Sequence, residues 1–327
     1  MLFIGVDVSK KKLDCALLIE PQKVKTKSRA VPNTAKGFKQ LLGWACRVGQ
    51  CEVGELSFIL EPSGVYHEPA AHELHRSGAH VCLVNPAHLR HFAKGLAVRS
   101  KNDALDRMVL ARYGYMVRPR AWQPPPPEVL ELQSLIQRLE AVEADRQREL
   151  NRLEKANAAH EPKPVRDSLR RSLEFLEQQR RELQRLIDDH IDRHPQLKRD
   201  QELLKSIPGV GQSTATRMVV VLRARTFESA REVAAWAGLV PVEYDSGTSV
   251  HRRPRMSKGG DARVRAKLYW PAVSATRFNP DVRALYERLL AGGKCKMSAL
   301  GAAMRKLVHI CFGVLKHQRP YQAMRAV

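Results

Sequence analysis

Four acidic side chains have the types and spacing that a divalent-metal site requires. Asp7 interrupts an apolar strand near the N-terminus, where a lone carboxylate is costly to desolvate unless a cation lies against it. Glu61 ends a second apolar run, and Asp103 and Asp106 share one helix face because they are three residues apart. Hard oxygen ligands suit Mg²⁺ or Mn²⁺, and two such ions can clamp the attacking and leaving oxygens of a phosphodiester. Acids favoured by a helix dipole, beside an edge-strand aspartate, are the alternative that spacing leaves open.

A second group of residues combines a nucleophile with phosphate-binding cations. Ser246 stands in an Asp-Ser-Gly turn, directly ahead of a run rich in arginine, lysine and glycine. Its hydroxyl could attack a phosphorus atom whose charge the cations neutralise, giving a covalent intermediate. Ordinary turn chemistry followed by a solvated basic face is the other interpretation. The cations that we expect to hold nucleic-acid backbone are Arg252, Arg253, Arg255, Lys258, Arg263, Arg265 and Lys267.

Gly209 and Gly211 form a Gly-x-Gly between two predicted helices. This pattern resembles the hairpin of a helix-hairpin-helix element, whose glycines let backbone amides approach a phosphate. An ordinary interhelical turn fits the same residues. The nearly neutral charge of residues 201–249 does not favour the phosphate interpretation.

The charge distribution indicates a nucleic-acid partner. The formal net charge is +22, and residues 250–327 hold 17 basic and 3 acidic groups, net +14. Such a block attracts polyphosphate and releases its counterions on binding. We expect no transmembrane helix, because no stretch of about 18 uncharged apolar residues occurs, and no amphipathic anchor backs the cationic stretches. Six cysteines without CxxC spacing predict reduced thiols and a cytoplasmic protein.

The N-terminal pattern predicts an α/β domain with an RNase-H-like order of elements. A meander of three antiparallel strands is followed by helices that alternate with two further strands, so Asp7 lies in a central strand. The predicted strands cover residues 2–8, 13–19, 24–31, 56–60 and 81–84, and the helices follow Asn33-Thr34 and cover residues 66–76, 88–96 and 101–115.

The rest of the chain is predicted to be mainly helical. Four prolines at residues 124–127 mark a boundary, because they favour a stiff extended linker. Two charged helices with broken apolar stripes follow, which indicates an antiparallel hairpin or an intermolecular coiled coil used for oligomerisation. We therefore predict three domains: residues 1–122, 123–200 and 201–327.

These motifs together resemble the IS-one-ten (IS110) family of bacterial insertion-sequence transposases, described as bridge-RNA-guided recombinases. The similar segments follow in family order and spacing over nearly the whole chain. They are residues 5–10, 60–66, 84–86, 101–106, 207–211, 237–241, 246–247 and 256–260.

The resemblance implies a RuvC-like N-terminal domain whose DEDD tetrad is Asp7, Glu61, Asp103 and Asp106. It implies a coiled-coil insertion and a C-terminal transposase domain with Ser246 as nucleophile, which forms a phosphoserine link to DNA before strand exchange. It further implies Mg²⁺ on the tetrad, an active site shared between subunits of a tetramer arranged as a dimer of dimers, and a structured RNA that pairs with donor and target DNA.

Three rival interpretations remain beside an RNA-guided recombinase acting in the bacterial cytoplasm at the nucleoid. A metal-dependent nuclease would use water as nucleophile and leave Ser246 idle. A basic packaging protein would not need the acids at all. An actin-like sugar kinase shares the first strand, but the proline boundary, the missing second phosphate loop and the basic C-terminal block argue against it.

Overall fold

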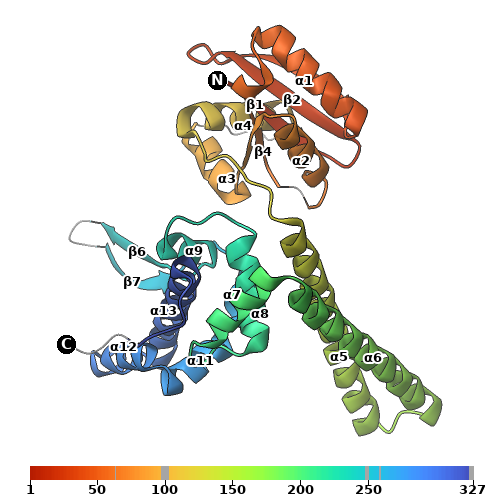
Figure 1. Ribbon diagram of the computed structural model, residues 1–327, viewed down its shortest axis with the longest axis vertical. Helices are drawn as coiled ribbons and strands as arrows, with labels where there is room; N and C mark the ends of the chain where they lie inside the picture. Colours follow the sequence, from red (N-terminus) through yellow and green to blue (C-terminus); the bar gives the residue numbers. More distant parts are fainter. Residues whose placement is uncertain (63, 97–102, 247–249, 258, 324–327) are drawn as a thin grey trace. The chain divides into compact units, whose positions relative to one another are not determined.

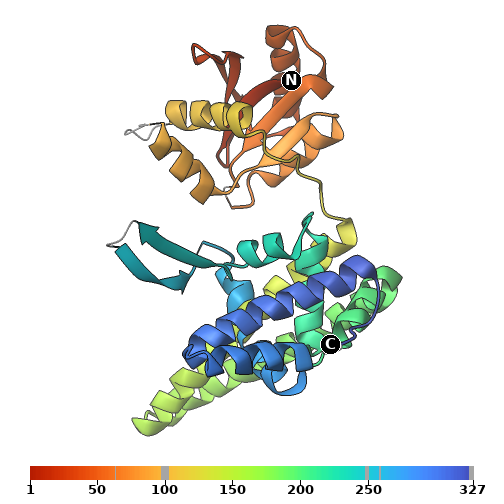
Figure 2. The same cartoon turned by 90° about the vertical axis from the view of Figure 1, so that its left-hand side faces the viewer.

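The chain divides into two compact units, Met1–Pro124 and Pro125–Val327 (Figures 1 and 2). The computed structural model describes residues 1–62, 64–96, 103–246, 250–257 and 259–323, without the side chains of 103–104 and 243–254. The boundary between the units falls inside the proline run, where a helix cannot continue. A further division near residue 200 stays a prediction.

A five-stranded mixed sheet forms the centre of the N-terminal unit, as the sequence predicts. Its order is β3-β2-β1-β4-β5. The first three strands pair antiparallel, whereas β4 pairs parallel with β1 and β5 pairs parallel with β4. The strands are β1 (Leu2–Val8), β2 (Lys12–Glu20), β3 (Lys25–Pro32), β4 (Leu56–Leu60) and β5 (His80–Leu83).

Helices cover both faces of this sheet, and the alternation of side chains along β1 decides which face each residue meets. Ile4 and Val6 belong to the apolar cluster of α1 and α2, whereas Phe3 belongs to the cluster of α3 and α4. Thr34 begins α1, because its hydroxyl accepts a hydrogen bond from the Gly37 amide (3.3 Å). The helices are α1 (Ala35–Gly49), the short η1 (Val53–Glu55), α2 (Glu68–Arg76), α3 (Pro86–Gly95) and α4 (Asp103–Val117).

Two long helices, α5 (Pro127–Ala158) and α6 (Lys163–Arg193), open the C-terminal unit and pack against each other as a hairpin within one chain (Figure 1). Ile136 and Leu139 of α5 and Ile187 of α6 are buried in one apolar cluster with the helices that follow. An ion pair joins Arg146 and Glu177 across the hairpin (2.9 Å). The predicted hairpin is therefore present.

Further helices pack against α13 (Lys296–His317), namely α7 (Pro195–Lys205), α9 (Ala230–Trp236), α11 (Tyr269–Phe278) and α12 (Pro280–Ala291). A two-stranded hairpin of β6 (Pro241–Ser246) and β7 (Val250–Met256) projects from this unit in both views (Figures 1 and 2). Among the described residues, α13 alone is long and apolar enough to cross a membrane, and more than half of its apolar stretch is buried in this core. The other helices are α8 (Gln212–Arg223) and α10 (Ala262–Lys267).

Buried polar side chains tie these helices together. Asp200 of α7 is fully buried and accepts hydrogen bonds from Arg223 Nε of α8 (2.5 Å) and from Gln318 Nε2 beyond α13 (2.9 Å). The Tyr321 hydroxyl donates a hydrogen bond to the Asp281 carboxylate of α12 (2.6 Å). The C-terminal segment is thereby fixed to the helical core.

Candidate active site and nucleic-acid interface

The sheet register brings Asp7 and Glu61 to the same edge. β1 and β4 run parallel with Val6 opposite Leu60, so the residues that follow, Asp7 and Glu61, are neighbours in register. Phe3 and Ile59 pack towards α3 and α4. Side chains alternate along a strand, so Asp7, four residues after Phe3, belongs to the face covered by α3 and α4. Glu61 comes two residues after Ile59, so the same alternation directs it towards this face.

Helix α4 crosses this face with its first turn directed at the same edge. A Cβ atom on Gly5 would lie 1.8 Å from the Arg107 carbonyl oxygen, so α4 and β1 touch through their backbones. Near its other end, α4 approaches Phe3 and Ile59, which a Cβ atom on Gly114 would meet. The helix therefore runs opposite to β1, with its N-terminus towards the strand end that holds Asp7.

Asp103 and Asp106 lie in that first turn of α4. Asp106 is half-buried, whereas the side chain of Asp103 lies outside the described residues. Over the part of the chain that is described, no three acidic, histidine or cysteine side chains come close enough together to hold a metal ion. The backbone brings the four acids to one edge, and the metal-ligand set itself stays a prediction.

Asp14 is an acidic residue at this edge that the sequence analysis did not single out. It pairs directly with Asp7 across β1 and β2 and is 7% exposed. Lys12 Nζ lies 2.7 Å from one of its carboxylate oxygens, and Arg107 Nη1 of α4 lies 3.7 Å from the other. Burial and the charge of Asp14 raise the pKa of the neighbouring Cys15 thiol. The Lys12-x-Asp14 spacing on a buried strand was the available signal, because a buried acid requires a cation.

Ser246 is the last residue of β6, where Val250 of β7 pairs with it. The base of this hairpin is fixed: the Ser257 amide donates to the Val240 carbonyl (2.8 Å). A Cβ atom on Gly260 would lie 2.1 Å from the Gly238 amide, so only glycine fits there. The Ser246 side chain and residues 247–249 lie outside the described residues.

The predicted nucleic-acid-binding cations divide into two groups. Arg252, Arg253 and Arg255 lie on β7, where Arg255 is exposed. The side chains of the other two, and all of Lys258, lie outside the described part of the chain.

The cations of α10 differ in their surroundings. Arg263 and Lys267 are exposed, and Lys267 Nζ lies 3.7 Å from Glu143 of α5. Arg265 Nη1 donates to the carbonyl oxygen of Ala237 (3.2 Å), which ties α10 to the end of α9. Arg265 therefore has a structural contact, and its role in binding nucleic acid stays a prediction.

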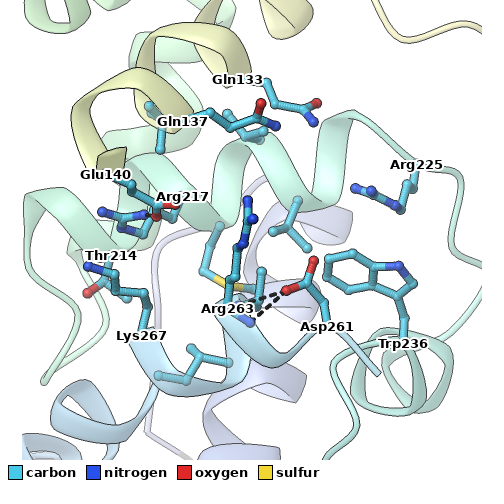
Figure 3. A pocket seen from close by; sticks show the side chains of 16 residues that line it. Gln133, Gln137, Glu140, Thr214, Arg217, Arg225, Trp236, Asp261, Arg263 and Lys267 are labelled. Atoms are coloured by element: carbon cyan, nitrogen blue, oxygen red, sulfur yellow. Dashed lines mark hydrogen bonds and ion pairs between the residues drawn. The ribbon is translucent and has the colours of Figure 1, made fainter. Parts of the chain in front are cut away.

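Arg263 and Lys267 also line a pocket of about 130 Å³ between α5, α8, α9 and α10 (Figure 3). Arg217 forms an ion pair with Glu140 on one side of it, and burial lowers the pKa of the Arg217 guanidinium. On the other side, the Arg225 guanidinium lies 4.3 Å from the ring centre of Trp236.

The pocket thus offers four cations, one indole and two acids. Glu140 is paired with Arg217, and the Asp261 carboxylate accepts hydrogen bonds from the Arg263 and Val264 amides at the start of α10 (2.9 and 3.0 Å). Such a lining attracts a phosphate or a base.

Gly209 is explained by packing. Its φ is +96°, and a Cβ atom there would lie 2.8 Å from the backbone of Ala275 in α11. Gly211 is exposed and precedes α8 as its N-cap. The Gly-x-Gly is therefore an interhelical turn that lets α11 approach closely, and phosphate binding by its amides stays a prediction.

Comparison with known proteins covers segments of both units. A DEDD-type transposase model of the IS110 group matches residues 4–157, and the model "Transposase IS116/IS110/IS902 family" matches residues 201–287. The chain is 30% identical over 322 residues to the pilin gene-inverting protein of Moraxella lacunata, covering 98% of this chain and 97% of that protein. The protein of the same name from Moraxella bovis is 29% identical over the same length. The uncharacterized 43.6 kDa protein of insertion element IS110 from Streptomyces coelicolor is 31% identical over 157 residues, 48% of this chain and 38% of that protein.

These matches define a DNA transposase, an enzyme that cleaves and rejoins DNA. The first matched region contains Asp7, Glu61 and Asp106, and the second contains Ser246. A DEDD transposase domain is of a type that binds divalent metal. The chain belongs to the IS116/IS110/IS902 family of transposases, which confirms the resemblance drawn from the sequence.

Proposed function

We propose that this transposase mobilises an insertion sequence by cutting and rejoining DNA through a covalent link to Ser246, with the DEDD acids holding the scissile phosphate. One observation carries the proposal: β1, β4 and the first turn of α4 converge, which directs Asp7, Glu61 and Asp106 to one edge of the sheet. The order β3-β2-β1-β4-β5 supports an RNase-H-like assignment of this unit.

The donor set fits a divalent cation. Asp7, Glu61, Asp103 and Asp106 supply hard carboxylate oxygens, which Mg²⁺ or Mn²⁺ prefers over the imidazole and thiolate ligands of softer metals. When bound, the metal would polarise the phosphate and stabilise its developing negative charge. Asp14 is a further acid at this edge, and Lys12 and Arg107 neutralise its charge. Its carboxylate therefore adds little electrostatic repulsion to the tetrad.

Ser246 supplies the nucleophile. Its oxygen would form a bond to phosphorus as the bond from phosphorus to a deoxyribose oxygen breaks, and the hydroxyl proton would pass to solvent or to the leaving oxygen. Attack by a second DNA hydroxyl would reverse these changes and free the serine. The cations of β7 and α10 would hold the DNA backbone during both steps.

Several finer features belong to the same proposal. The α5–α6 hairpin would act as a coiled-coil element that joins subunits, and the active site would combine acids and serine from different copies in a dimer of dimers. A structured RNA would select donor and target DNA by base pairing. The enzyme would act in the bacterial cytoplasm at the nucleoid. The name of the Moraxella relatives fits this chemistry, since gene inversion also requires DNA to be cut and rejoined.

The main alternative is a nuclease in which water attacks the phosphate. Trapping distinguishes the two: the purified enzyme is incubated with supercoiled donor DNA and Mg²⁺, denatured and analysed for protein–DNA adducts. We expect an adduct with the unmodified enzyme and none with Ser246→Ala, which should also fail to cut. Ser246→Cys is a second variant that keeps a nucleophile in place. Full cutting by Ser246→Ala without any adduct would establish the nuclease instead.

A further inference from the structure

Helix α11 presents two large aromatic side chains to solvent. Trp270 is 73% exposed and Phe278 is 70% exposed, and these are the two most exposed large apolar side chains among the described residues. Both lie on one face of the helix with Arg277, because residues seven and eight apart return to the same side. The opposite face is packed normally, with Ala272 and Ala275 fully buried. An exposed aromatic patch of this kind indicates a binding surface.

The charge along this segment is mainly positive. Residues 262–278 contain Arg263, Arg265, Lys267 and Arg277 and no acidic residue, and Asp261 and Asp281 lie just outside this range. Two acids belong to other elements: Glu143 of α5 lies 3.7 Å from Lys267, and Asp281 of α12 accepts a hydrogen bond from Tyr321. Both Lys267 and Glu143 are about half exposed, so a phosphate can replace the Glu143 carboxylate at little cost.

The backbone of α11 that carries these aromatic side chains is packed firmly against the helical core. The Tyr269 ring stands perpendicular to the indole of Trp270, with ring centres 5.3 Å apart, and Tyr269 itself packs against the helical core. Beneath the helix, Ala275 lies against the Gly209 turn, where no side chain could intervene. Because the backbone of α11 is held in place, stacking of a ligand costs only the side-chain freedom of the exposed ring.

We propose that this face of α11 binds a single-stranded segment of the DNA substrate, with Trp270 as the stacking platform for an unpaired base. Phe278 extends the platform by two helical turns, and Arg277 and Lys267 contact the phosphates on either side. The inference deepens the proposed function and rests on DNA being the substrate. A recombinase must expose unpaired bases while strands are exchanged, and every base has a face that can stack on an indole.

The positive charge of the exposed cations favours nucleic acid over a protein as the ligand of this face. A protein surface matched to two aromatic rings and three exposed cations would need a dense acidic patch, whereas single-stranded DNA supplies bases and phosphates together along one chain. Arg263 and Lys267 also line the pocket of Figure 3, so the same cations lead from the platform to a second basic site.

The test is binding of a labelled single-stranded oligodeoxynucleotide to the full-length protein, followed by fluorescence anisotropy. We expect Trp270→Ala to weaken binding by about 5- to 150-fold, the range for loss of one base–aromatic stack. Trp270→Phe should recover most of this loss. Met116→Ala is the control, because Met116 is 58% exposed at the C-terminal end of α4, where no DNA or subunit contact is predicted, and this variant should bind as the unmodified protein does.

Oligonucleotides with abasic sites separate stacking from backbone contacts. Removing the bases should weaken DNA binding by the unmodified protein more than binding by Trp270→Ala, which keeps only Phe278 for stacking, whereas Arg277→Gln should reduce the salt dependence of binding to both oligonucleotides. Equal binding by Trp270→Ala and the unmodified protein would overturn the inference alone. If the unmodified protein bound no DNA, the proposed function would fail with it.

Two other outcomes would assign the surface to a different occupant. An RNA of the same sequence that bound more than ten times tighter, with the same dependence on Trp270, would replace DNA by RNA. Dissociation of an oligomer by Trp270→Ala, with unchanged DNA affinity per subunit in light-scattering and anisotropy measurements, would make the face an interface between copies of the chain.

Discussion

The two units hold their helices by different means. In the N-terminal unit, α4 meets β1 through backbone atoms at Gly5, so no side chain separates helix from sheet. In the C-terminal unit, buried polar side chains such as Asp200 join helices that are distant in sequence. This direct backbone contact sets the distance between α4 and β1, which carry acids of the sheet edge. The helical unit adds such polar contacts to its apolar core and to the close approach of Ala275 to Gly209, and its serine lies on a projecting hairpin.

The largest effect should come from the acids themselves. Asp7→Asn keeps the size of the side chain but removes the charge that a divalent metal requires, so we expect DNA cleavage to fall by at least about 100-fold. Cleavage of supercoiled DNA measures this. Asp14→Asn is the matched change on the neighbouring strand: it should cost about 1–3 kcal/mol of stability, because Arg107 and Lys12 lose their partner. If the folded Asp14→Asn protein lost cleavage as completely, the distinction between the two acids would be wrong.

Gly5→Ala tests the backbone contact. The added methyl group would meet the Arg107 carbonyl at 1.8 Å, so α4 must move away, and we expect a loss of about 3 kcal/mol or more in the free energy of unfolding. Urea titration followed by circular dichroism measures this loss. Gly43→Ala is the control, since nothing lies within 4 Å of its Cβ position and it is an exposed helical site. That variant should be more stable by about 0.5–1 kcal/mol.

Asp200→Ala tests the polar contacts of the helical unit. It leaves Arg223 without its buried partner and removes the acceptor for Gln318, so we expect a loss of about 3 kcal/mol. The unfolding transition of the C-terminal unit should shift, while the near-ultraviolet signal of the N-terminal unit stays as before. A simultaneous shift of both units would show that they unfold together and would weaken the comparison.

His309 should give the smallest effect, seen only as a pH dependence. Burial and the charges of Arg305, Lys306 and Arg231 lower the pKa of this histidine in α13. The unfolded chain therefore takes up a proton more readily, and stability present above about pH 6.5 is lost as the pH falls through the folded pKa. His309→Gln should flatten this decline between pH 7 and pH 5 in urea titrations. An unchanged slope would exclude His309 as its source.

Much of the N-terminal unit could be predicted because its strands are apolar runs with turn residues at their ends. Asp7 and Glu61 interrupt or end such runs, so their positions followed from the pattern, and Thr34 has the sequence of a helix cap. Asp14 was missed because its cations come from Lys12 two residues earlier and from Arg107 of a distant helix. No local pattern could reveal the second of these contacts.

The C-terminal unit was harder to predict. The arginine-rich segment is a strand, β7, because the facing strand β6 pairs with it, which composition does not show. Gly209 was ambiguous until Ala275 was found against it. Trp270 was not singled out, since a tryptophan in an apolar stretch is usually buried. Its exposure depends on which face of α11 meets the core, and that is settled only by tertiary packing.

The anchored base of the β6–β7 hairpin makes the strands a molecular ruler. The Ser257 amide is hydrogen-bonded to the Val240 carbonyl, and Gly260 lies against Gly238. From this anchor, the six residues of β6 extend about 20 Å to Ser246. Deleting two residues from each strand would retract the serine by about 7 Å while keeping the alternation of side chains. Under the proposed mechanism, the length of this arm would set how far from the helical core Ser246 can attack a phosphate.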